Sequence, residues 1–402
     1  MKIIYLSTSC STEKYKWVYE MRSVKAIEPQ QKFNALFIRG LAEQPNVDVV
    51  AISTLPISAS TSTIKRIDFE EENISDSLKY QYISFRNGKL TRLIDMYVNT
   101  KRILKDYLEN NKNERCYIIA DVLSPFMTLG CFKVAQRYNV PIVGIITDLP
   151  ELATGMKERK GSVLKKYILK GIEKLNTSLL NKYDAYITLT ESINDVVNTN
   201  HSKKHLVIEG SIDANVTYND TKKSPTQEVV YAGGVYEKYG VKTLVEAFSR
   251  LNVANELHIY GDGTFVEELK VLSKKYPQIK YKGMVSLEEI VEIERKATLL
   301  VNPRPSNEEF SKYSFPSKTL EYMSSGTPLL STKLPGIPSD YFDFIYAIEK
   351  EDTEGMADTL SKILSNDASV LKEKGLRAFT YVKQNKTNVA QAKKIVDFLN
   401  SL

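Results

Sequence analysis

The chain of 402 residues has little of the residues on which disulfide, zinc and histidine chemistry depend. It contains three cysteines, Cys10, Cys116 and Cys131, and three histidines without a metal-like pairing. Three scattered thiols are too few for a disulfide framework or a zinc site. The order of these residues along the chain also gives no basis for assigning a Ser-His-Asp or Cys-His catalytic set. The sequence therefore offers no metal centre and no nucleophilic triad.

Long hydrophobic runs are also absent. No apolar stretch approaches the roughly 18 residues of a membrane-spanning helix. Residues 1–10, MKIIYLSTSC, turn polar too early for a signal peptide. We interpret this segment as a first β-strand and expect a cytoplasmic protein, with a peripheral position at the inner face of the cell membrane as an option.

That option comes from the distribution of charge. Residues 156–182 hold eight basic and two acidic side chains, an excess equal to the whole net charge of +6. Leucines and isoleucines share one helical face here and lysines share another, as in helices that lie on an anionic membrane. The alternative is a solvated helix whose apolar face belongs to a domain core. Basic and aromatic residues do not interleave along a reading element, so we expect no nucleic-acid partner.

Strand-like apolar runs alternate with helical patterns along the chain, which predicts an α/β fold with parallel, doubly wound sheets. The polar run 215–228 lacks periodicity and separates two halves of single-core size, as a linker or a surface excursion. We predict an N-terminal domain over 1–212, a C-terminal domain over 213–385, and a helix over 386–402 that packs back on the first domain.

The most informative segment is 299–332, LLVNPRPSNEEFSKYSFPSKTLEYMSSGTPLLST. It predicts a strand that ends near Arg304, a loop, a helix over 315–325 and a second strand. The helix start offers free backbone N–H groups and the positive end of the helix dipole, beside Ser317 and Lys318. With the arginine, these features predict an anion site that suits phosphate.

Glu321 lies one turn deeper in the same predicted helix, between Leu320 and Tyr322. This is an unusual place for a charge that only faces solvent. A carboxylate there is able to accept two sugar hydroxyls. Phosphate-binding and hydroxyl-binding groups together predict a pocket for a nucleoside diphosphate.

Three predicted strands before this segment end in glycine turns, and a lysine follows the first. These residues are Gly233, Gly234, Lys238, Gly261, Asp262 and Gly283. Ligands of α/β folds bind at the carboxyl ends of strands, and glycine lets the backbone approach them closely. The second turn lacks the third glycine of a dinucleotide fingerprint, because that position is Val266. For each turn, plain chain reversal is the alternative.

The order GG-x3-K-x-G, GDG and NPRP…SFPSK-x2-EYM-x2-GTP resembles the C-terminal half of GT-B retaining glycosyltransferases of the family 4 type. The likeness is clearest over 228–366. Within the family, the chain is similar to bacterial enzymes that build capsular or extracellular polysaccharide. The likeness implies two Rossmann-like domains that face each other across a cleft. It also implies transfer of a hexose or N-acetylhexosamine from a UDP-linked donor, with retention and without an essential metal or other cofactor.

The resemblance also assigns roles. Glu321 would grip the ribose, and Ser317 and Lys318 would meet the diphosphate opposite Gly233, Gly234 and Lys238. Lys238, Lys318, Glu321 and Asp148 are then the candidate catalytic residues. The remaining candidates for donor binding are Gly261, Asp262, Gly283 and Arg304.

Two departures from the family pattern stand out. Relatives carry an arginine and a lysine where this chain has Gly234 and Tyr239, and a first glutamate where it has Tyr313. Lys318 or Arg304 would supply the missing positive charge. Glu308 or Glu309 would supply the missing acid.

On the acceptor side, Asp148 ends a predicted strand, where it would orient a sugar hydroxyl or cap the next segment. The loop 9–13 is a second candidate. The expected acceptor is a saccharide, lipid-linked if the basic segment docks on a membrane. Two other functions stay open, a non-catalytic partner of a glycosyltransferase and a sugar-nucleotide epimerase, although a histidine-poor chain disfavours the epimerase.

Overall fold

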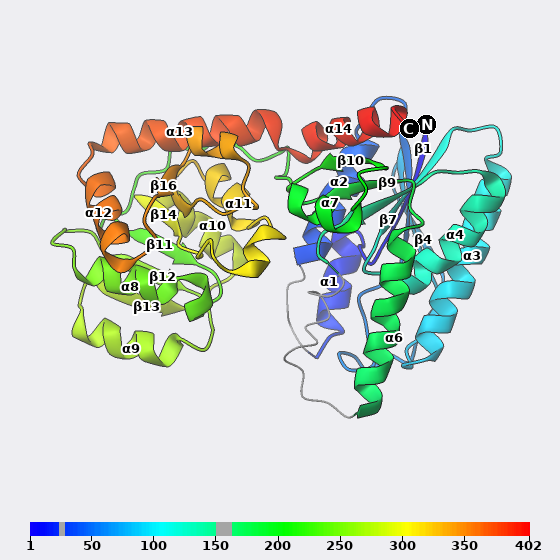
Figure 1. Ribbon diagram of the computed structural model, residues 1–402, viewed down its shortest axis with the longest axis horizontal. Helices are drawn as coiled ribbons and strands as arrows, with labels where there is room; N and C mark the ends of the chain where they lie inside the picture. Colours follow the sequence, from blue (N-terminus) through cyan, green and yellow to red (C-terminus); the bar gives the residue numbers. More distant parts are fainter. Residues whose placement is uncertain (24–28, 150–162) are drawn as a thin grey trace. The chain divides into compact units, whose positions relative to one another are not determined.

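The computed structural model describes residues 1–23, 29–149 and 163–402. The chain divides into two compact units, shown in Figure 1. Unit 1 comprises Met1–Ser211 and Asn388–Leu402, and unit 2 comprises Ile212–Thr387. Among the described residues, no helix has both the length and the apolar character needed to cross a bilayer.

Unit 1 is built on a sheet that has eight strands within the described residues, in the order β10-β9-β8-β7-β1-β2-β5-β4. Its strands are β1 (Lys2–Ser7), β2 (Asp48–Ser53), β4 (Glu70–Ser75), β5 (Leu78–Tyr82), β7 (Cys116–Asp121), β8 (Ile142–Ile146), β9 (Ala185–Thr188) and β10 (Lys204–Val207). Neighbouring strands run parallel, except for the antiparallel pair β4 and β5. Every residue of β7 is buried, as expected for a parallel sheet covered on both faces.

The helices of unit 1 cover both faces of this sheet, with α1 and α2 on one side and α3 and α4 on the other (Figure 1). They are α1 (Thr12–Glu20), α2 (Pro29–Ala42), α3 (Thr91–Asn110), α4 (Pro125–Tyr138), α6 (Val163–Leu180), α7 (Glu191–Val197) and α14 (Asn388–Asn400). Helix α14 contacts α2, and its Ala392, Ile395 and Leu399 are fully buried in the core of unit 1.

Unit 2 is built on a parallel sheet of six strands, in the order β13-β12-β11-β14-β15-β16. Its strands are β11 (Val229–Ala232), β12 (Leu257–Tyr260), β13 (Ile279–Gly283), β14 (Leu299–Asn302), β15 (Leu329–Thr332) and β16 (Tyr346–Ile348). Its α-helices are α8 (Val241–Ser249), α9 (Val266–Lys275), α10 (Leu287–Lys296), α11 (Lys318–Ser324), α12 (Thr353–Leu364) and α13 (Ala368–Asn385), and its 3₁₀ turns are η1 (Glu237–Tyr239), η2 (Glu309–Lys312) and η3 (Ser339–Asp343).

The polar run 215–228 belongs to unit 2 and does not join the units. The Tyr218 ring packs on Phe379, with 5.4 Å between ring centroids. Lys223 donates hydrogen bonds to the Thr327 hydroxyl and the Arg295 carbonyl, at 2.8 and 2.9 Å. This run is therefore a surface excursion that covers the ends of α10 and α11.

Four strands were not predicted from the sequence, namely β3 (Arg66–Ile67), β4, β5 and β6 (Phe85–Arg86). β4 reads EEENIS and is mostly exposed at the edge of the sheet. An exposed edge strand needs no apolar face, so it carries no hydrophobic alternation. β3 and β6 form a separate two-stranded sheet of two residues each, too short to show a period.

Candidate functional site

The loops at the carboxyl edge of the unit 2 sheet approach one another through glycine. Gly261 has a φ of +128°, and a Cβ atom there would lie 1.8 Å from the Gly233 carbonyl oxygen. Gly240 has a φ of +77°, and its Cβ would lie 1.9 Å from the Pro303 carbonyl oxygen. Only glycine fits both positions. The loops after β11, β12 and β14 are thus in backbone contact, which brings Gly233 close to the start of the Arg304 loop.

Tyr322 fastens the opposite side of the site. Its buried hydroxyl accepts a hydrogen bond from the Ala232 amide at 2.9 Å and donates one to the Ala232 carbonyl at 3.0 Å. Helix α11 is thereby fixed to the end of β11. The helix begins at Lys318, later than the predicted start at Phe315. Proline at 316 disfavours helical geometry in the residue before it, which corrects that prediction.

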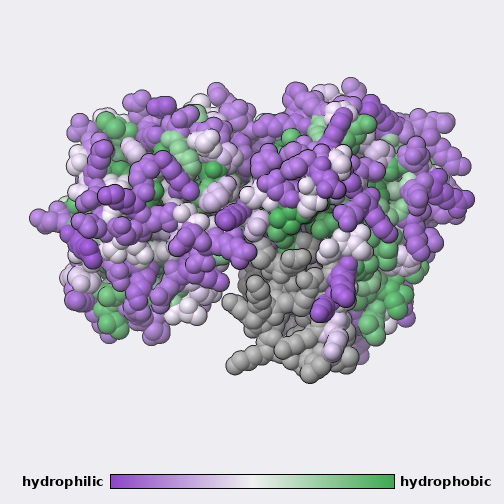
Figure 2. All heavy atoms as spheres, viewed as in Figure 1, coloured by the Kyte–Doolittle hydropathy of each residue, from purple (hydrophilic) through white to green (hydrophobic). Residues whose placement is uncertain are grey.

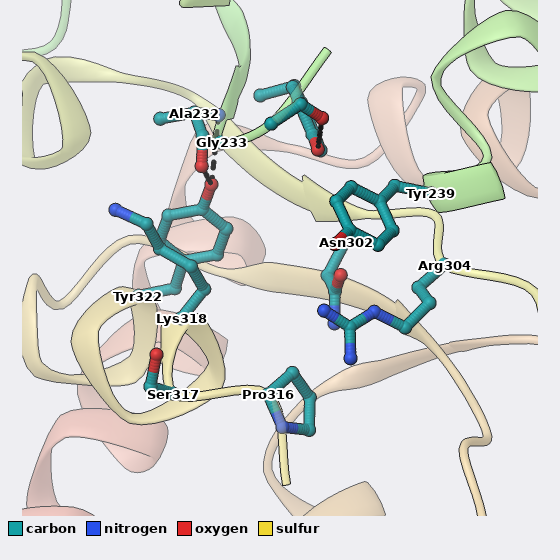
Figure 3. Close-up of a pocket in the computed structure, with 11 residues that line it drawn as sticks. Ala232, Gly233, Tyr239, Asn302, Arg304, Pro316, Ser317, Lys318 and Tyr322 are labelled. Atoms are coloured by element: carbon teal, nitrogen blue, oxygen red, sulfur yellow. Dashed lines mark hydrogen bonds between the residues drawn. The ribbon is translucent and has the colours of Figure 1, made fainter. Parts of the chain in front are cut away.

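A cavity of about 100 Å³ lies between these elements. It is lined by Tyr231, Ala232, Gly233, Gly234, Tyr239, Asn302, Arg304, Pro316, Ser317, Lys318 and Tyr322. Figure 3 shows Arg304 beside Tyr239 and Asn302, across from Lys318 and Tyr322. Ligand pockets usually measure roughly 300–1,000 Å³, so this cavity has room for a phosphate-sized group and not for a whole nucleotide.

Arg304 is held on the cavity wall by two aromatic rings. Its guanidinium carbon lies 5.1 Å from the Tyr239 ring centroid and 5.3 Å from that of Phe310. A guanidinium nitrogen donates to the Ser314 hydroxyl at 3.3 Å. Burial lowers the pKa of Arg304, and it remains a cation at neutral pH. A guanidinium held by these contacts has further N–H groups with which to bind a phosphate group.

Lys318 supplies the second cation. Its ammonium lies 3.1 Å from a carboxylate oxygen of Glu321 and 3.6 Å from one of Glu294. Burial acts to lower the Lys318 pKa, but the two carboxylates outweigh it, so the pKa is raised. Lys318 is therefore firmly protonated at neutral pH. Sequence reasoning missed Glu294, which is only 3% exposed on α10.

The structure brings together five of the predicted residues. Gly233, Gly234, Arg304, Ser317 and Lys318 all line the cavity. Glu321 lies next to it, since its carboxylate is paired with Lys318 and its side chain is 31% exposed. These residues come from three separate stretches of chain, which the fold gathers at one sheet edge.

Lys238 does not join them, contrary to its predicted place on the phosphate. It lies exposed on η1, with its ammonium 5.9 and 5.6 Å from the ring centroids of Tyr236 and Tyr239. Among the described residues that line the cavity, Tyr239 takes the place expected for a lysine. The 3₁₀ turn rotates Lys238 out and Tyr239 in. The tyrosine at this position places its ring 5.1 Å from the Arg304 guanidinium carbon.

The other glycine-turn residues support the site without lining it. Asp262 accepts a hydrogen bond from the Gly263 amide at 2.8 Å, and its backbone carbonyl accepts one from the Val235 amide at 2.9 Å. The Gly261 amide donates to the Gly283 carbonyl at 2.8 Å. Within the described residues, none of Gly261, Asp262 and Gly283 lines the cavity. The turn interpretation fits all three.

Three residues on the Arg304 loop bear on the acid that the resemblance leads us to expect. Glu309 is exposed on η2, and Glu308 precedes it. Tyr313, at the position of the missing acid, ends the same turn. In the described part of the chain, none of these three side chains lines the cavity.

The carboxyl edge of the unit 1 sheet has different chemistry. Asp148 follows β8, and burial raises its pKa. Asp121, at the end of β7, was not predicted. It is 1% exposed and accepts hydrogen bonds from Gln30, Asn34 and the Leu123 amide at 2.5, 3.1 and 3.0 Å. Burial raises its pKa to about 6. In the loop 9–13, Ser11 caps α1.

Comparison with known proteins places this geometry in context. Residues 226–366 match the model of the family described as glycosyl transferases group 1. Comparison with curated protein sequences gives no match.

Several solved structures are similar along the whole chain. Sucrose-phosphate synthase from Thermosynechococcus elongatus has a TM-score of 0.65 and 13% identity, covering 100% of this chain and 99% of its own. The E. coli trehalose-6-phosphate structure bound with UDP-2-fluoro glucose has a TM-score of 0.64 and 11% identity, covering 99% of each chain. Anabaena HepE in complex with UDP-glucose has a TM-score of 0.56 and 13% identity, covering 100% of each chain. At these identities the likeness shows the fold alone, which is the GT-B fold with two α/β units built on parallel sheets.

Proposed function

From the match of its C-terminal unit to the group 1 glycosyl transferases, we infer that this chain is a glycosyltransferase that uses a nucleotide sugar. The structural observation that carries the proposal is the cavity at the carboxyl edge of unit 2. It combines two cations, Arg304 and Lys318, with a glycine loop and an adjacent carboxylate, Glu321. Solved proteins with the same fold bind UDP-glucose and UDP-2-fluoro glucose. We therefore propose a UDP-linked hexose or N-acetylhexosamine as donor.

The cavity suits the group that leaves in such a reaction. Departure of a nucleoside diphosphate builds negative charge on its β-phosphate. Arg304 and Lys318 would stabilise that charge from fixed positions, and Gly233 would let the backbone approach it. One such contact typically contributes about 2.7–4 kcal/mol to lowering the barrier. The cavity has room for one phosphate group, so the ribose would lie outside it, where Glu321 would accept the 2′ and 3′ hydroxyls.

The finer features of the proposal rest on the family resemblance. We propose transfer with retention at the anomeric carbon, with the chain's own cations in the charge-neutralising role that a metal plays in other enzymes. Asp148 in unit 1 would orient the acceptor hydroxyl. The acceptor would be a saccharide, lipid-linked, in bacterial surface polysaccharide synthesis.

The donor proposal is tested by thermal shift against UDP, GDP and their sugar conjugates. We expect UDP and one UDP-sugar to raise the melting temperature of the wild type. Glu321→Ala should lose this shift while still folding, because the Glu321 side chain is 31% exposed and Glu294 remains to pair with Lys318. A folded wild type that responds to none of the nucleotides would contradict the transferase proposal and favour a non-catalytic partner.

A membrane as the site of action is supported by one face of unit 1. Leu90, Ile94 and Val98 are 67%, 57% and 50% exposed and follow one another at helical spacing along the start of α3. Figure 2 shows hydrophobic side chains gathered over this end of the helix. Lysines 101, 170 and 174 are exposed on α3 and α6, which both contact α4. Exposed apolar side chains, together with exposed cations on the same and a nearby helix, fit an anionic lipid surface.

The basic segment 156–182 is only partly available to this argument. Residues 156–162 lie outside the described residues. Leu179 and Leu180 are buried near the end of α6, which contacts α4, so that part of its apolar face belongs to the core. We therefore propose that α3 supplies the apolar contact and that exposed lysines of α6 supply charge, with the chain peripheral at the inner face of the cytoplasmic membrane.

Sedimentation with vesicles tests the membrane proposal. We expect binding to phosphatidylglycerol vesicles that weakens with salt and is absent with phosphatidylcholine. The double substitution Ile94→Ser and Val98→Ser should reduce binding several-fold, whereas Val370→Ser, at a position of similar exposure in unit 2, should not. Equal binding by all variants would overturn the assignment of this face.

A further inference from the structure

Glu294 is a buried acid at the edge of the proposed donor site. It lies on α10, one turn after Ile290, and both side chains face the interior. The helix starts with a capping box formed by Ser286 and Glu289. At the end of α10, the Thr327 hydroxyl donates to the Glu294 carbonyl at 2.7 Å. Helix α10 is thus held at both of its ends.

The carboxylate of Glu294 is directed at Lys318. The ammonium of Lys318 lies 3.6 Å from Glu294 and 3.1 Å from Glu321. The Glu294 side chain is 4% exposed, whereas that of Glu321 is 31% exposed. The Tyr322 ring lies below the ammonium, with 5.8 Å to the ring centroid. Lys318 therefore has one fixed interior partner and one accessible partner on its own helix.

Glu294 and Glu321 would no longer both serve as partners of Lys318 when a nucleotide binds. In the proposed function, ribose hydroxyls donate to Glu321, and the diphosphate faces Lys318. Hydroxyls that occupy Glu321 weaken its hold on the ammonium. Glu294 is out of reach of solvent and stays with Lys318. A charge-assisted contact to a fixed acid keeps a flexible lysine in one orientation.

We propose that Glu294 is a positioning residue, which holds Lys318 toward the diphosphate when Glu321 turns to the ribose. This inference rests on the proposed donor site. A positioning role differs from that of a merely structural ion pair in its effect on binding. Glu294 should matter for binding the phosphates of the ligand and not for binding its nucleoside.

The pKa of Lys318 agrees with this role. Burial acts to lower it, and the charges of Glu321 and Glu294 raise it above its ordinary value. When the ribose takes up Glu321, Glu294 continues to favour the charged ammonium. The cation is thereby retained at the stage when the diphosphate needs it.

The test compares UDP with uridine by titration of the whole chain. In Glu294→Gln, UDP should bind about tenfold more weakly, while uridine binds as in the wild type. The control is Glu292→Gln on the same helix, at an exposed acid paired with Arg295 at 2.8 Å, and it should leave both affinities unchanged. Unchanged or tighter UDP binding by Glu294→Gln, or an equal loss for uridine, would overturn the inference.

A double-mutant cycle gives a second readout. In a Lys318→Met background, Glu294→Gln should cause no further loss of UDP affinity, because the residue it positions is gone. A loss equal to that in the wild-type background would contradict the proposal. If Glu294→Gln does not fold, Glu294→Asp keeps the charge one methylene farther from Lys318 and should still weaken UDP alone.

The same data separate this inference from the proposed function. A wild type that binds no UDP contradicts the donor site itself. A wild type that binds UDP, with Glu294→Gln behaving as Glu292→Gln does, contradicts only the role of Glu294.

Discussion

The two sheets of this chain end in edges of opposite chemistry. In unit 1 the edge holds a buried acid, Asp121, enclosed by amide donors, with Asp148 on the next strand. In unit 2 the edge holds a cavity with two cations, Arg304 and Lys318, and glycine loops. Both edges come from parallel strands, where the fold places ligand sites. The fold thus supplies the place for a ligand, while a few loop residues decide whether that place suits an anion or hydroxyl groups.

The largest effect is expected from replacing a glycine that builds the unit 2 edge. Gly261→Ala should lower the free energy of unfolding of unit 2 by more than about 3 kcal/mol, because it combines a strained φ with a backbone clash. The control is Gly171→Ala in α6 of unit 1. A Cβ there meets nothing within 4 Å, so alanine should stabilise by about 0.5–1 kcal/mol. Urea unfolding followed by circular dichroism measures both, and similar effects would refute the glycine account.

A smaller loss of stability is expected on removing the hydrogen bonds that join α11 to the sheet. Tyr322→Phe removes the hydroxyl that bonds both polar groups of Ala232, and should cost about 2 kcal/mol. Tyr281→Phe, which removes a hydrogen bond of 3.0 Å to the Gly261 carbonyl from a partly exposed side chain, should cost less. Thermal unfolding ranks the two variants, and the reverse order would show that α11 is held in another way.

At the unit 1 edge, Asp121 should make the stability of the unit depend on pH. The pKa of Asp121 is raised to about 6 by burial, so the folded state binds this proton more tightly than the unfolded state. Its contribution to stability is therefore greatest at low pH and is lost as pH rises through about 6. Relative to Asp121→Asn, the wild type should gain about 1 kcal/mol between pH 7 and pH 5.

Trp17, the one tryptophan of the sequence, lies in unit 1, and its fluorescence during urea unfolding isolates this unit. A difference between wild type and Asp121→Asn that does not change with pH would show that the acid is ionised throughout.

Much of this architecture could be predicted from the sequence. Alternating apolar runs predict the parallel strands, since β11, β12 and β14 are short, continuous and buried. The charged edge strand β4 could not be found this way, because an edge strand pairs through its backbone and its side chains face water.

The site was predictable in its parts and not in its detail. Sequence spacing predicts that Arg304, Ser317 and Lys318 meet, because Arg304 follows a strand end and the other two open the helix that comes after the same loop. It does not predict that η1 turns Lys238 outward and Tyr239 onto Arg304, since this depends on the local turn geometry. The buried position of Glu294 could have been predicted from the sequence. It shares the helix face of Ile290, where a solvated acid is out of place.

The central claim is that the unit 2 edge binds a diphosphate through the cations of the cavity. Calorimetric titration of UDP into the wild type, Arg304→Met and Lys238→Met tests it most directly. Both substitutions remove one positive charge from neighbouring loops, but only Arg304 lines the cavity. The account predicts a loss of affinity of about 10- to 100-fold for Arg304→Met and less than about threefold for Lys238→Met. A large loss for Lys238→Met with little change for Arg304→Met would contradict it.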